Sequence, residues 1–355
     1  MRGHGRRGLL ALALAVAALA AGPAACTAAG DAAPGPSPTA GGATPSPAPA
    51  RPLVTMAEAG RALKEILSAD GVLGAAAPRL PADQNNLLRQ SRDGHLALAQ
   101  AAFESAENTG EAPPRHTWGE PRLLVPRLEG GAAWFAAVVD RRDASGGTYP
   151  VILTLSRQGE DDWQISSLSR LEEELPQIAL DADGYATALG DDDPAVQISP
   201  RLMAPLHATT AEEGAAGFAA GLIADGPHTS AHASEIVTER LKEKKKCVGY
   251  DSIFAAANYP VRALRTADGG ALIAYSLIRT TTRVVKDRCA PFVRVPEEAL
   301  GLASAPYALA ELRVVETHQY VSTVPAKDSS RTARIVGYTG GITRVIITPD
   351  LEAPS

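Results

Sequence analysis

The spacing of hydrophobic and polar positions shows the same progression twice along the chain, from helical to strand periodicity. In the first half, apolar residues at helical spacing predict helices that begin at Thr55, where Thr55 and Glu58 form a capping box, and at Asp93. Alternating runs separated by glycine-containing turns follow. We expect these strands at residues 118–128, 132–140, 149–157 and 163–170.

The second half repeats this order. A second capping box, Thr210 to Glu213, predicts a helix that carries Phe218, Leu222 and Ile223. Another helix is expected over residues 230–246, followed by strands at residues 261–266, 271–285, 308–324 and 334–347. Because strands cluster after helices instead of alternating with them, we predict an α+β fold with two tandem domains, each with two helices packed on a curved antiparallel sheet.

The N-terminus has the layout of an export signal. Arginines at positions 2, 6 and 7 precede an apolar run over residues 9–21, and small residues precede Cys26. The run is shorter than the ~20 residues that a bilayer-spanning helix needs. Bacterial lipoprotein processing attaches diacylglycerol to a cysteine in this position. We therefore predict a signal peptide at residues 1–25 and a lipid on Cys26 that holds the protein at the outer face of the cytoplasmic membrane.

Two features of the signal leave alternatives open. The usual lipobox carries leucine three residues before the cysteine, where this chain has Pro23. The alternative is an ordinary signal peptide cut near Ala24 and Ala25, with Cys26 as a spare thiol. Arg6 and Arg7 leave general secretion and twin-arginine export both open.

The amino-acid composition after the signal peptide changes along the chain and indicates where segments and domains begin and end. Residues 27–52 are almost entirely Ala, Gly, Pro, Ser and Thr, which cannot bury enough apolar surface to offset their conformational entropy. We expect a lipid-anchored disordered tether, an α+β domain, an acidic connector, a second α+β domain and a tail. Their respective boundaries are residues 26–52, 53–171, 172–206, 207–350 and 351–355.

Cysteines and charge narrow the class of protein. Cys247 and Cys289 remain once Cys26 is assigned to the lipid, and in an oxidising compartment such a pair favours a disulfide. The net charge is −6, and the signal removes only arginines, so the mature chain is more acidic still. An acidic surface argues against nucleic acid and anionic headgroups as partners, so we expect membrane contact through the lipid anchor.

The order of elements, with Trp163 opening the last strand of the first half, resembles the NTF2-like or cystatin-like cone, in which a curved sheet wraps around helices. The lipobox, the stretch Val261 to Tyr275 and the segment Gly226 to Thr229 ahead of it resemble a family of uncharacterised actinobacterial lipoproteins with a domain of unknown function. The resemblance covers most of residues 52–350. It implies an exported, membrane-tethered protein and supplies no catalytic residues.

One strand carries a candidate constellation. Alternation over residues 308–324 places Leu312 and Val314 on the same face as Glu316, His318 and Tyr320. If that face points into a cone, a carboxylate beside an imidazole could transfer protons or orient a polar ligand. The alternative is that these groups lie at a solvated rim, so we assign no catalytic residue and keep the three as weak candidates.

Other patterns favour structural interpretations. His228, His232 and Glu235 have metal-like spacing, but a solvated helix start explains them more simply. The run Asp181 to Asp192 lacks the glutamate of a calcium loop and is interpreted as a turn. The basic run Lys242 to Lys246 suits a helix C-terminus, with docking to an acidic wall polymer as an alternative. We predict no metal and no cofactor.

The sequence thus predicts a non-enzymatic binding or accessory module of the cell envelope, with another envelope protein as a possible partner. The alternatives are a small-ligand-binding protein that uses a cone interior and, third, an NTF2-like isomerase or hydratase working through Glu316 and His318. A binder or enzyme needs an open pocket of at least ~300 Å³ with convergent polar groups, whereas an accessory module can fill its interior.

Overall fold

The computed structural model describes residues 52–68, 81–111, 116–286 and 290–348, within a compact unit that spans Ala50–Ser355. The signal peptide, nearly all of the tether, Cys26, Cys289 and the tail lie outside the described residues. The lipid anchor and the disulfide between Cys247 and Cys289 therefore stay predictions. Within the described ranges, no helix is long and apolar enough to cross a bilayer.

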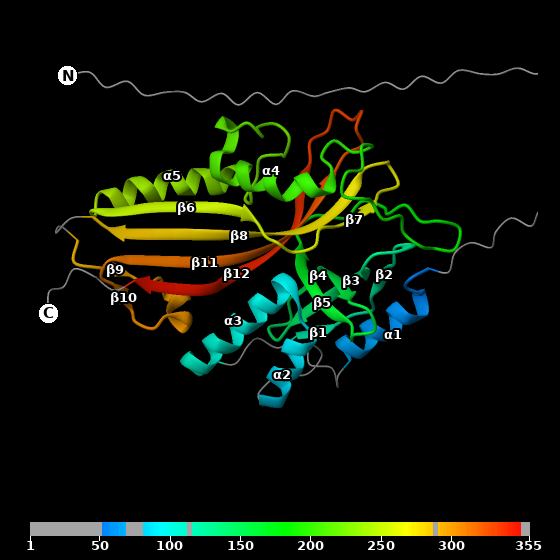
Figure 1. Cartoon of the computed structure of the whole chain (residues 1–355), viewed down its shortest axis with the longest axis horizontal. Coiled ribbons are helices and arrows are strands. Elements are labelled where there is room, and N and C mark those ends of the chain that lie inside the picture. The colour runs from blue at the N-terminus through cyan, green and yellow to red at the C-terminus, as the bar shows by residue number, and fades with distance from the viewer. Residues whose placement is uncertain (1–51, 69–80, 112–115, 287–289, 349–355) are drawn as a thin grey trace, which may run out of the picture. The chain divides into compact units, whose positions relative to one another are not determined.

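Among the described residues, the first half contains three helices and five strands (Figure 1). Thr55 caps the first helix as predicted, because its hydroxyl accepts a hydrogen bond from the Glu58 amide at 3.2 Å. The expected strand at residues 118–128 is two short strands instead of one. The elements are α1 (Met56–Leu67), α2 (Pro81–Arg89), α3 (Asp93–Thr109), β1 (His116–Trp118), β2 (Arg122–Leu124), β3 (Ala133–Asp143), β4 (Thr148–Arg157) and β5 (Gln164–Leu171).

The described part of the second half contains two α-helices and seven strands. They are α4 (Pro200–Glu213), α5 (Ser230–Lys244), β6 (Val248–Ala256), β7 (Arg262–Arg265), β8 (Ala271–Val285), β9 (Val293–Arg294), β10 (Tyr307–Ala308), β11 (Glu311–Val324) and β12 (Arg334–Thr348). Strand β8 has the predicted bounds, and β12 differs by one residue. A short 3-10 helix over Glu297–Leu302 lies between β9 and β10.

The predicted helix start at Thr210 is wrong. Helix α4 begins at Pro200, whose fixed backbone angle suits the first helical position, and ends at Glu213. Thr210 lies inside the helix, and its hydroxyl donates to the Leu206 carbonyl oxygen at 2.9 Å instead of capping. Phe218, expected on the buried face of a helix, is 79% exposed.

The α+β class is confirmed, but the two groups of strands join into one sheet, apart from β9 and β10, which pair with each other. The order is β1-β3-β4-β5-β12-β11-β8-β6, with β2 added beside β3 and β7 beside β8. The join consists of Leu171 opposite Gly337 and Arg170 opposite Tyr338. The expected pair of separate sheets is therefore connected through β5 and β12, and the domain boundaries stay a prediction.

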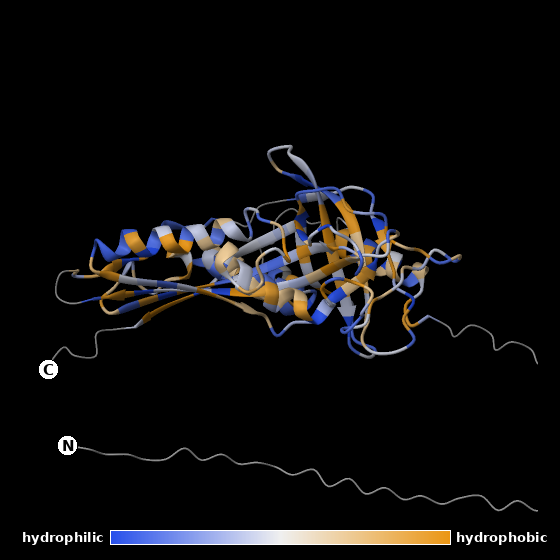
Figure 2. Cartoon of the chain, turned by 90° about the horizontal axis from the view of Figure 1, so that it is seen from above, coloured by the Kyte–Doolittle hydropathy of each residue, from blue (hydrophilic) through white to orange (hydrophobic). Residues whose placement is uncertain are grey.

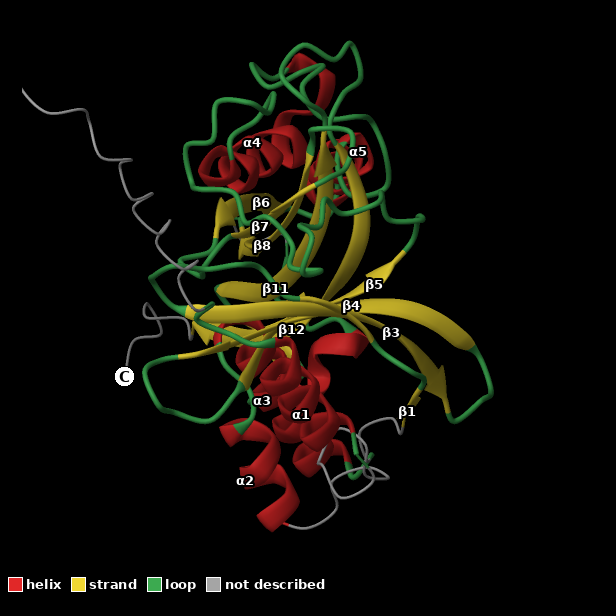
Figure 3. Cartoon of the chain, turned by 90° about the vertical axis from the view of Figure 1, so that its right-hand side faces the viewer, coloured by secondary structure: helices red, strands yellow, loops and turns green. Residues whose placement is uncertain are grey.

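Helices cover both faces of this sheet (Figure 3). Helices α4 and α5 pack on one face of β6, β8 and β11, where Met203 and Ile236 join the largest apolar cluster. Helix α3, from the first half, lies on the opposite face and contacts β5, β11 and β12. Figure 2 shows apolar and polar residues alternating along α5. Ile236 of this helix is buried, whereas Val237 and Leu241 are 55% and 60% exposed.

A buried glutamine reinforces the join between the halves. Gln319 of β11 is fully buried, and its side-chain oxygen accepts a hydrogen bond from the Leu168 amide of β5 at 3.0 Å. Its side-chain nitrogen donates to the Ser166 carbonyl oxygen at 3.3 Å. Gly94 of α3 lies so close that an added Cβ would come within 2.9 Å of this nitrogen. Gln319 thus connects β11, β5 and α3 at one point.

We expect Gln319→Leu to lower the free energy of unfolding by about 3 kcal/mol, because it leaves two buried backbone groups of β5 without partners. Urea denaturation measures the change. Gln164→Leu serves as the control, since its side chain bonds the Arg89 carbonyl oxygen in an exposed position, and it should cost less than about 1 kcal/mol. Equal unfolding midpoints for Gln319→Leu and the unsubstituted protein would contradict this role.

Candidate functional site

The three candidate residues of β11 share the face that points toward α4 and α5. Glu316 is partly exposed and lines a cavity, whereas His318 and Tyr320 are each only 1% exposed. The solvated-rim alternative is therefore wrong for His318 and Tyr320. The Tyr320 hydroxyl lies 2.9 Å from Nδ1 of His318.

An arginine that the sequence analysis did not single out lies directly opposite Glu316. Arg279 of β8 pairs with Glu316 across the two strands, and its Nε lies 3.6 Å from the carboxylate. Its Nη2 donates to Glu235 of α5 at 2.9 Å, and its Nε donates to the Ser252 hydroxyl at 2.9 Å. Arg279 is buried, so two carboxylates compensate one desolvated guanidinium.

These contacts shift the acidity of both carboxylates. The hydrogen bond with His232 and the contact with Arg279 lower the pKa of Glu235 to about 2. Burial would raise the pKa of Glu316, but His318, whose Nε2 lies 3.5 Å from the carboxylate, and Arg279 hold it below its usual value. Burial lowers the pKa of His318 despite its glutamate neighbour, which favours the neutral imidazole at pH 7.

Histidine and tyrosine rings form the layer behind this network. Four of the seven histidines gather here from α4, α5, β11 and the loop before α5. Three tyrosines of β8, β11 and β12 lie among them, and the centroids of neighbouring rings are 4.4–6.3 Å apart. The members of this aromatic layer are His207, His228, His232, His318, Tyr275, Tyr320 and Tyr338.

His207 has a single tautomer that satisfies its neighbours. Burial lowers its pKa to about 3, so the ring is neutral. Nε2 lies 2.7 Å from the His228 carbonyl oxygen, which can only accept, so Nε2 carries the proton. Nδ1 then accepts from the Tyr275 hydroxyl at 2.8 Å. These two hydrogen bonds fix the orientation of the His207 ring within the aromatic layer.

The interpretation of His228 as a solvated residue is wrong. It precedes α5, as predicted, but the loop folds inward and leaves His228 8% exposed. Its Nε2 lies 2.8 Å from Glu172, which directly follows β5 of the first half. Its ring centroid lies 4.4 Å from that of Tyr338. Across the described ranges, no three His, Cys, Asp or Glu side chains are arranged to hold a metal ion.

A cavity of about 440 Å³ opens in front of these groups. Its floor is β8, β11 and β12, one wall is Glu235 of α5, and another is Glu298 of the 3-10 helix. Arg279, Glu316 and Tyr338 face it, but neither His318 nor Tyr320 lines it. We call this the α5 pocket.

Three polar groups of the α5 pocket are uncommitted. Within the described part of the chain, the Tyr338 hydroxyl, the Glu298 carboxylate and the Arg283 guanidinium have no hydrogen-bond or ion-pair partner. Arg283 is half-buried and lies over the ring of Tyr250, 5.4 Å from its centroid. Burial raises the pKa of Tyr338 to about 12, so its hydroxyl stays protonated and can donate.

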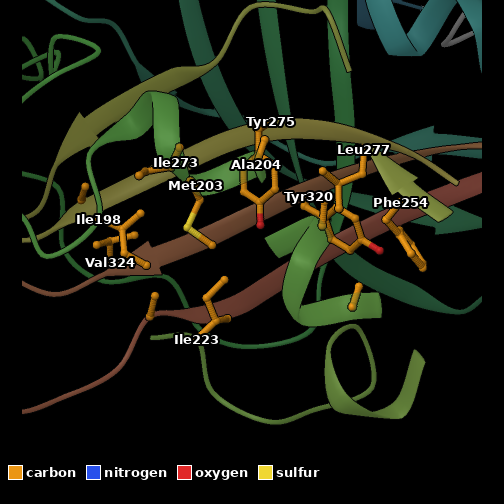
Figure 4. Close-up of a cluster of buried hydrophobic side chains, with 14 of the residues drawn as sticks. Ile198, Met203, Ala204, Ile223, Phe254, Ile273, Tyr275, Leu277, Tyr320 and Val324 are labelled. Atoms are coloured by element: carbon orange, nitrogen blue, oxygen red, sulfur yellow. The ribbon is translucent and has the colours of Figure 1, made fainter. Parts of the chain in front are cut away.

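The interior under α4 is filled, in contrast to the α5 pocket. Figure 4 shows Met203, Ile273 and Val324 gathered there with Tyr275 and Tyr320. The glycine at position 340 of β12 allows Tyr338 to border the α5 pocket. A Cβ added at this position would collide with the Tyr338 hydroxyl and come within 3.0 Å of His318. Glycine at this position lets the tyrosine lie against the histidine.

Two other cavities are clearly larger than the α5 pocket but chemically less convergent. One of about 550 Å³ is lined by five charged residues, of which four are already paired, Arg334 with Glu173 and Arg331 with Asp268. Another of about 680 Å³ lies between α3 and the sheet, and its charged residues are Glu104 and Arg344. Convergence of buried charge with uncommitted polar groups therefore favours the α5 pocket as the functional site.

Fold and pocket together define an α+β protein with a charged, open cavity on one face of a long antiparallel sheet. The chain belongs to the family described as a domain of unknown function, DUF8094, which matches residues 50–345.

Curated relatives are named only as lipoproteins. An uncharacterized lipoprotein of Streptomyces coelicolor is 27% identical over 82% of this chain and 86% of its own length. One of Streptomyces avermitilis is 28% identical over 62% of this chain and 65% of its own length. A second from Streptomyces coelicolor is 29% identical over 61% of both chains. No solved structure matches this chain.

We expect acid to destabilise the protein through Glu235. A carboxyl group whose pKa is lowered by folding stabilises the native state above its unfolded value of 4.5, and this stabilisation is lost as the pH falls toward 2. Urea unfolding at about pH 6 and about pH 3 should therefore show a smaller decrease for Glu235→Gln than for the unsubstituted protein. Glu120→Gln, which alters an exposed carboxylate, is the control, and a decrease for Glu235→Gln as large as that of the control would refute the assignment.

Proposed function

We propose that this protein is a lipid-anchored lipoprotein of the cell envelope that binds a small polar ligand in the α5 pocket without transforming it. The anchor is supported by the signal layout before Cys26 and by relatives that are named lipoproteins. The observation that carries the binding function is the α5 pocket itself. Its volume of about 440 Å³ falls in the range of ligand sites, ~300–1,000 Å³.

The charges of the pocket indicate the kind of ligand. Arg279 is already neutralised by Glu235 and Glu316, whereas Arg283 has no counter-ion among the described residues. A ligand with an anionic group would supply one. The Tyr338 hydroxyl and Glu298 then offer a donor and an acceptor to a second polar group.

Binding is favoured over catalysis because of where the histidine lies. His318 is the group best suited to move a proton, yet it is 1% exposed and does not border the cavity. A general base must come within hydrogen-bond reach of the proton that it takes. Glu316 and Arg279 do border the cavity, but they are committed to each other.

We also propose that each half corresponds to one NTF2-like or cystatin-like cone, with a connector between them that begins at residue 172 and ends before α4 at Pro200. Two observations support this: helices precede the strands in both halves, and α4 and α5 pack on one face of the second group of strands. The connector lies between the halves, with Ala186 bridged to Pro126 and Ala188 bridged to Leu264.

The binding function is tested with the mature chain carrying Cys26→Ser, screened by thermal shift and calorimetry against amino acids, small carboxylates and small phosphates. We expect at least one to bind, and Tyr338→Phe or Arg283→Met to weaken it about 10-fold or more, as for loss of a charge-assisted hydrogen bond. Tyr185→Phe and Arg313→Met are matched controls outside the pocket and should leave the affinity unchanged. Binding that is equally strong in all four variants, or no binding with no ligand in native mass spectra, would refute the proposal.

The anchor is tested separately in cells. The unsubstituted chain should incorporate labelled fatty acid and remain in the membrane fraction, whereas Cys26→Ala should lose the label and leave the membrane or remain uncut. A label that persists in Cys26→Ala would exclude Cys26 as the lipid site. Release of the unlabelled, unsubstituted protein into the medium would support the ordinary signal peptide instead.

A further inference from the structure

A second cavity adjoins the α5 pocket. Its volume is about 450 Å³, and residues of the C-terminal half of α5 and of the segment 290–296, which contains β9, line it. Arg283 and Pro296 line both this cavity and the α5 pocket. The two cavities therefore meet at these side chains, and we call the second one the β9 pocket.

The β9 pocket is mainly apolar. Val248, Val293 and Val295 line it and belong to one buried apolar cluster. Phe292 also lines it and is 37% exposed, which is high for a large apolar side chain. An open cavity walled by such groups leaves apolar surface in contact with water, and an apolar part of a ligand would remove that contact.

The charges around the β9 pocket are unbalanced. On α5, Lys242 pairs with Glu239 at 2.9 Å and Lys246 pairs with Glu243 at 2.8 Å, so these acids are committed. The guanidinium groups of two arginines, Arg283 and Arg294, have no acidic partner within the described residues. Arg294 instead lies 5.5 Å from the centroid of the Phe292 ring. This pocket thus combines apolar walls with uncompensated positive charge.

We propose that the two pockets form one site for an anionic amphiphile with a single apolar chain. Its anionic group lies at Arg283, where the pockets meet, and its chain lies along Phe292, Val293 and Val295. Any further polar group on the same molecule points toward Tyr338 and Glu298 in the α5 pocket. This inference rests on the proposed binding function and specifies its ligand class.

Calorimetry with decanoate tests the proposal, using the mature chain carrying Cys26→Ser. Butanoate has the same charge with a short chain, and decyltrimethylammonium has the same chain with the opposite charge. We expect decanoate to bind at least 10-fold more tightly than either. Arg283→Met and Phe292→Glu should each weaken decanoate at least 10-fold, the second by placing a like charge against the carboxylate.

Ile253→Glu is the matched control for Phe292→Glu, because Ile253 is an exposed apolar residue of β6 outside both pockets. It should leave the decanoate affinity unchanged, and circular dichroism checks that each variant is folded. Equal affinity for decanoate and decyltrimethylammonium would overturn the anionic assignment. Equal affinity for decanoate and butanoate, or no effect of Phe292→Glu, would overturn the apolar assignment.

The outcome also separates this inference from the proposed function. If a small polar ligand binds in a manner sensitive to Tyr338→Phe while decanoate does not bind, the amphiphile inference fails and the binding function stands. If neither binds, both fail. Binding of decanoate only when it is part of a lipid vesicle would assign the site to a membrane surface and overturn the proposal of a free amphiphile.

Discussion

The side-chain amide of Gln319 fixes the sheet where its two groups of strands meet. Strands β5 and β12 share only two residue pairs among the described residues. Next to these pairs, the side chain of Gln319 forms hydrogen bonds with the backbone of β5 at Leu168 and Ser166. Because successive side chains of a strand point to opposite faces, holding Gln319 on the α3 face holds His318 and Tyr320 on the α4 and α5 face. The aromatic layer behind the α5 pocket therefore depends on an interaction made on the other side of the sheet.

The open and filled parts of the interior differ in their side chains rather than in their backbone. Strands β8 and β11 continue under both helices, but the residues under α4 are apolar, whereas those under α5 include Arg279 and Glu316. Arg279 and Glu316 favour contact with water or polar groups, because a charge removed from water is costly without partners. The cavity forms at the charged end of the same pair of strands.

Patterns of neighbouring residues in the sequence predicted several strands and the face on which the candidate residues lie. Alternation and glycine turns predicted β8 and β12 closely, and alternation correctly placed Glu316, His318 and Tyr320 on one face. Strand β6 and helix α2 were missed, and the capping-box pattern at Thr210 was misleading because the same residue types also occur inside helices. Arg279 belongs to the same alternation as Tyr275 and Leu277, so a charged residue in a buried register was its available signal. Its pairing with Glu316 and the pairing of His228 with Glu172 depend on topology, which no local pattern contains.

Helix α3 is encoded in the first half but covers strands of the second. Gly94 lies against Ser276, Thr317 and Gln319, three buried polar residues. A chain begun after the connector would expose these groups to water and would also remove the acid opposite His228. Exchange of one half between related genes would therefore join surfaces that had not changed together.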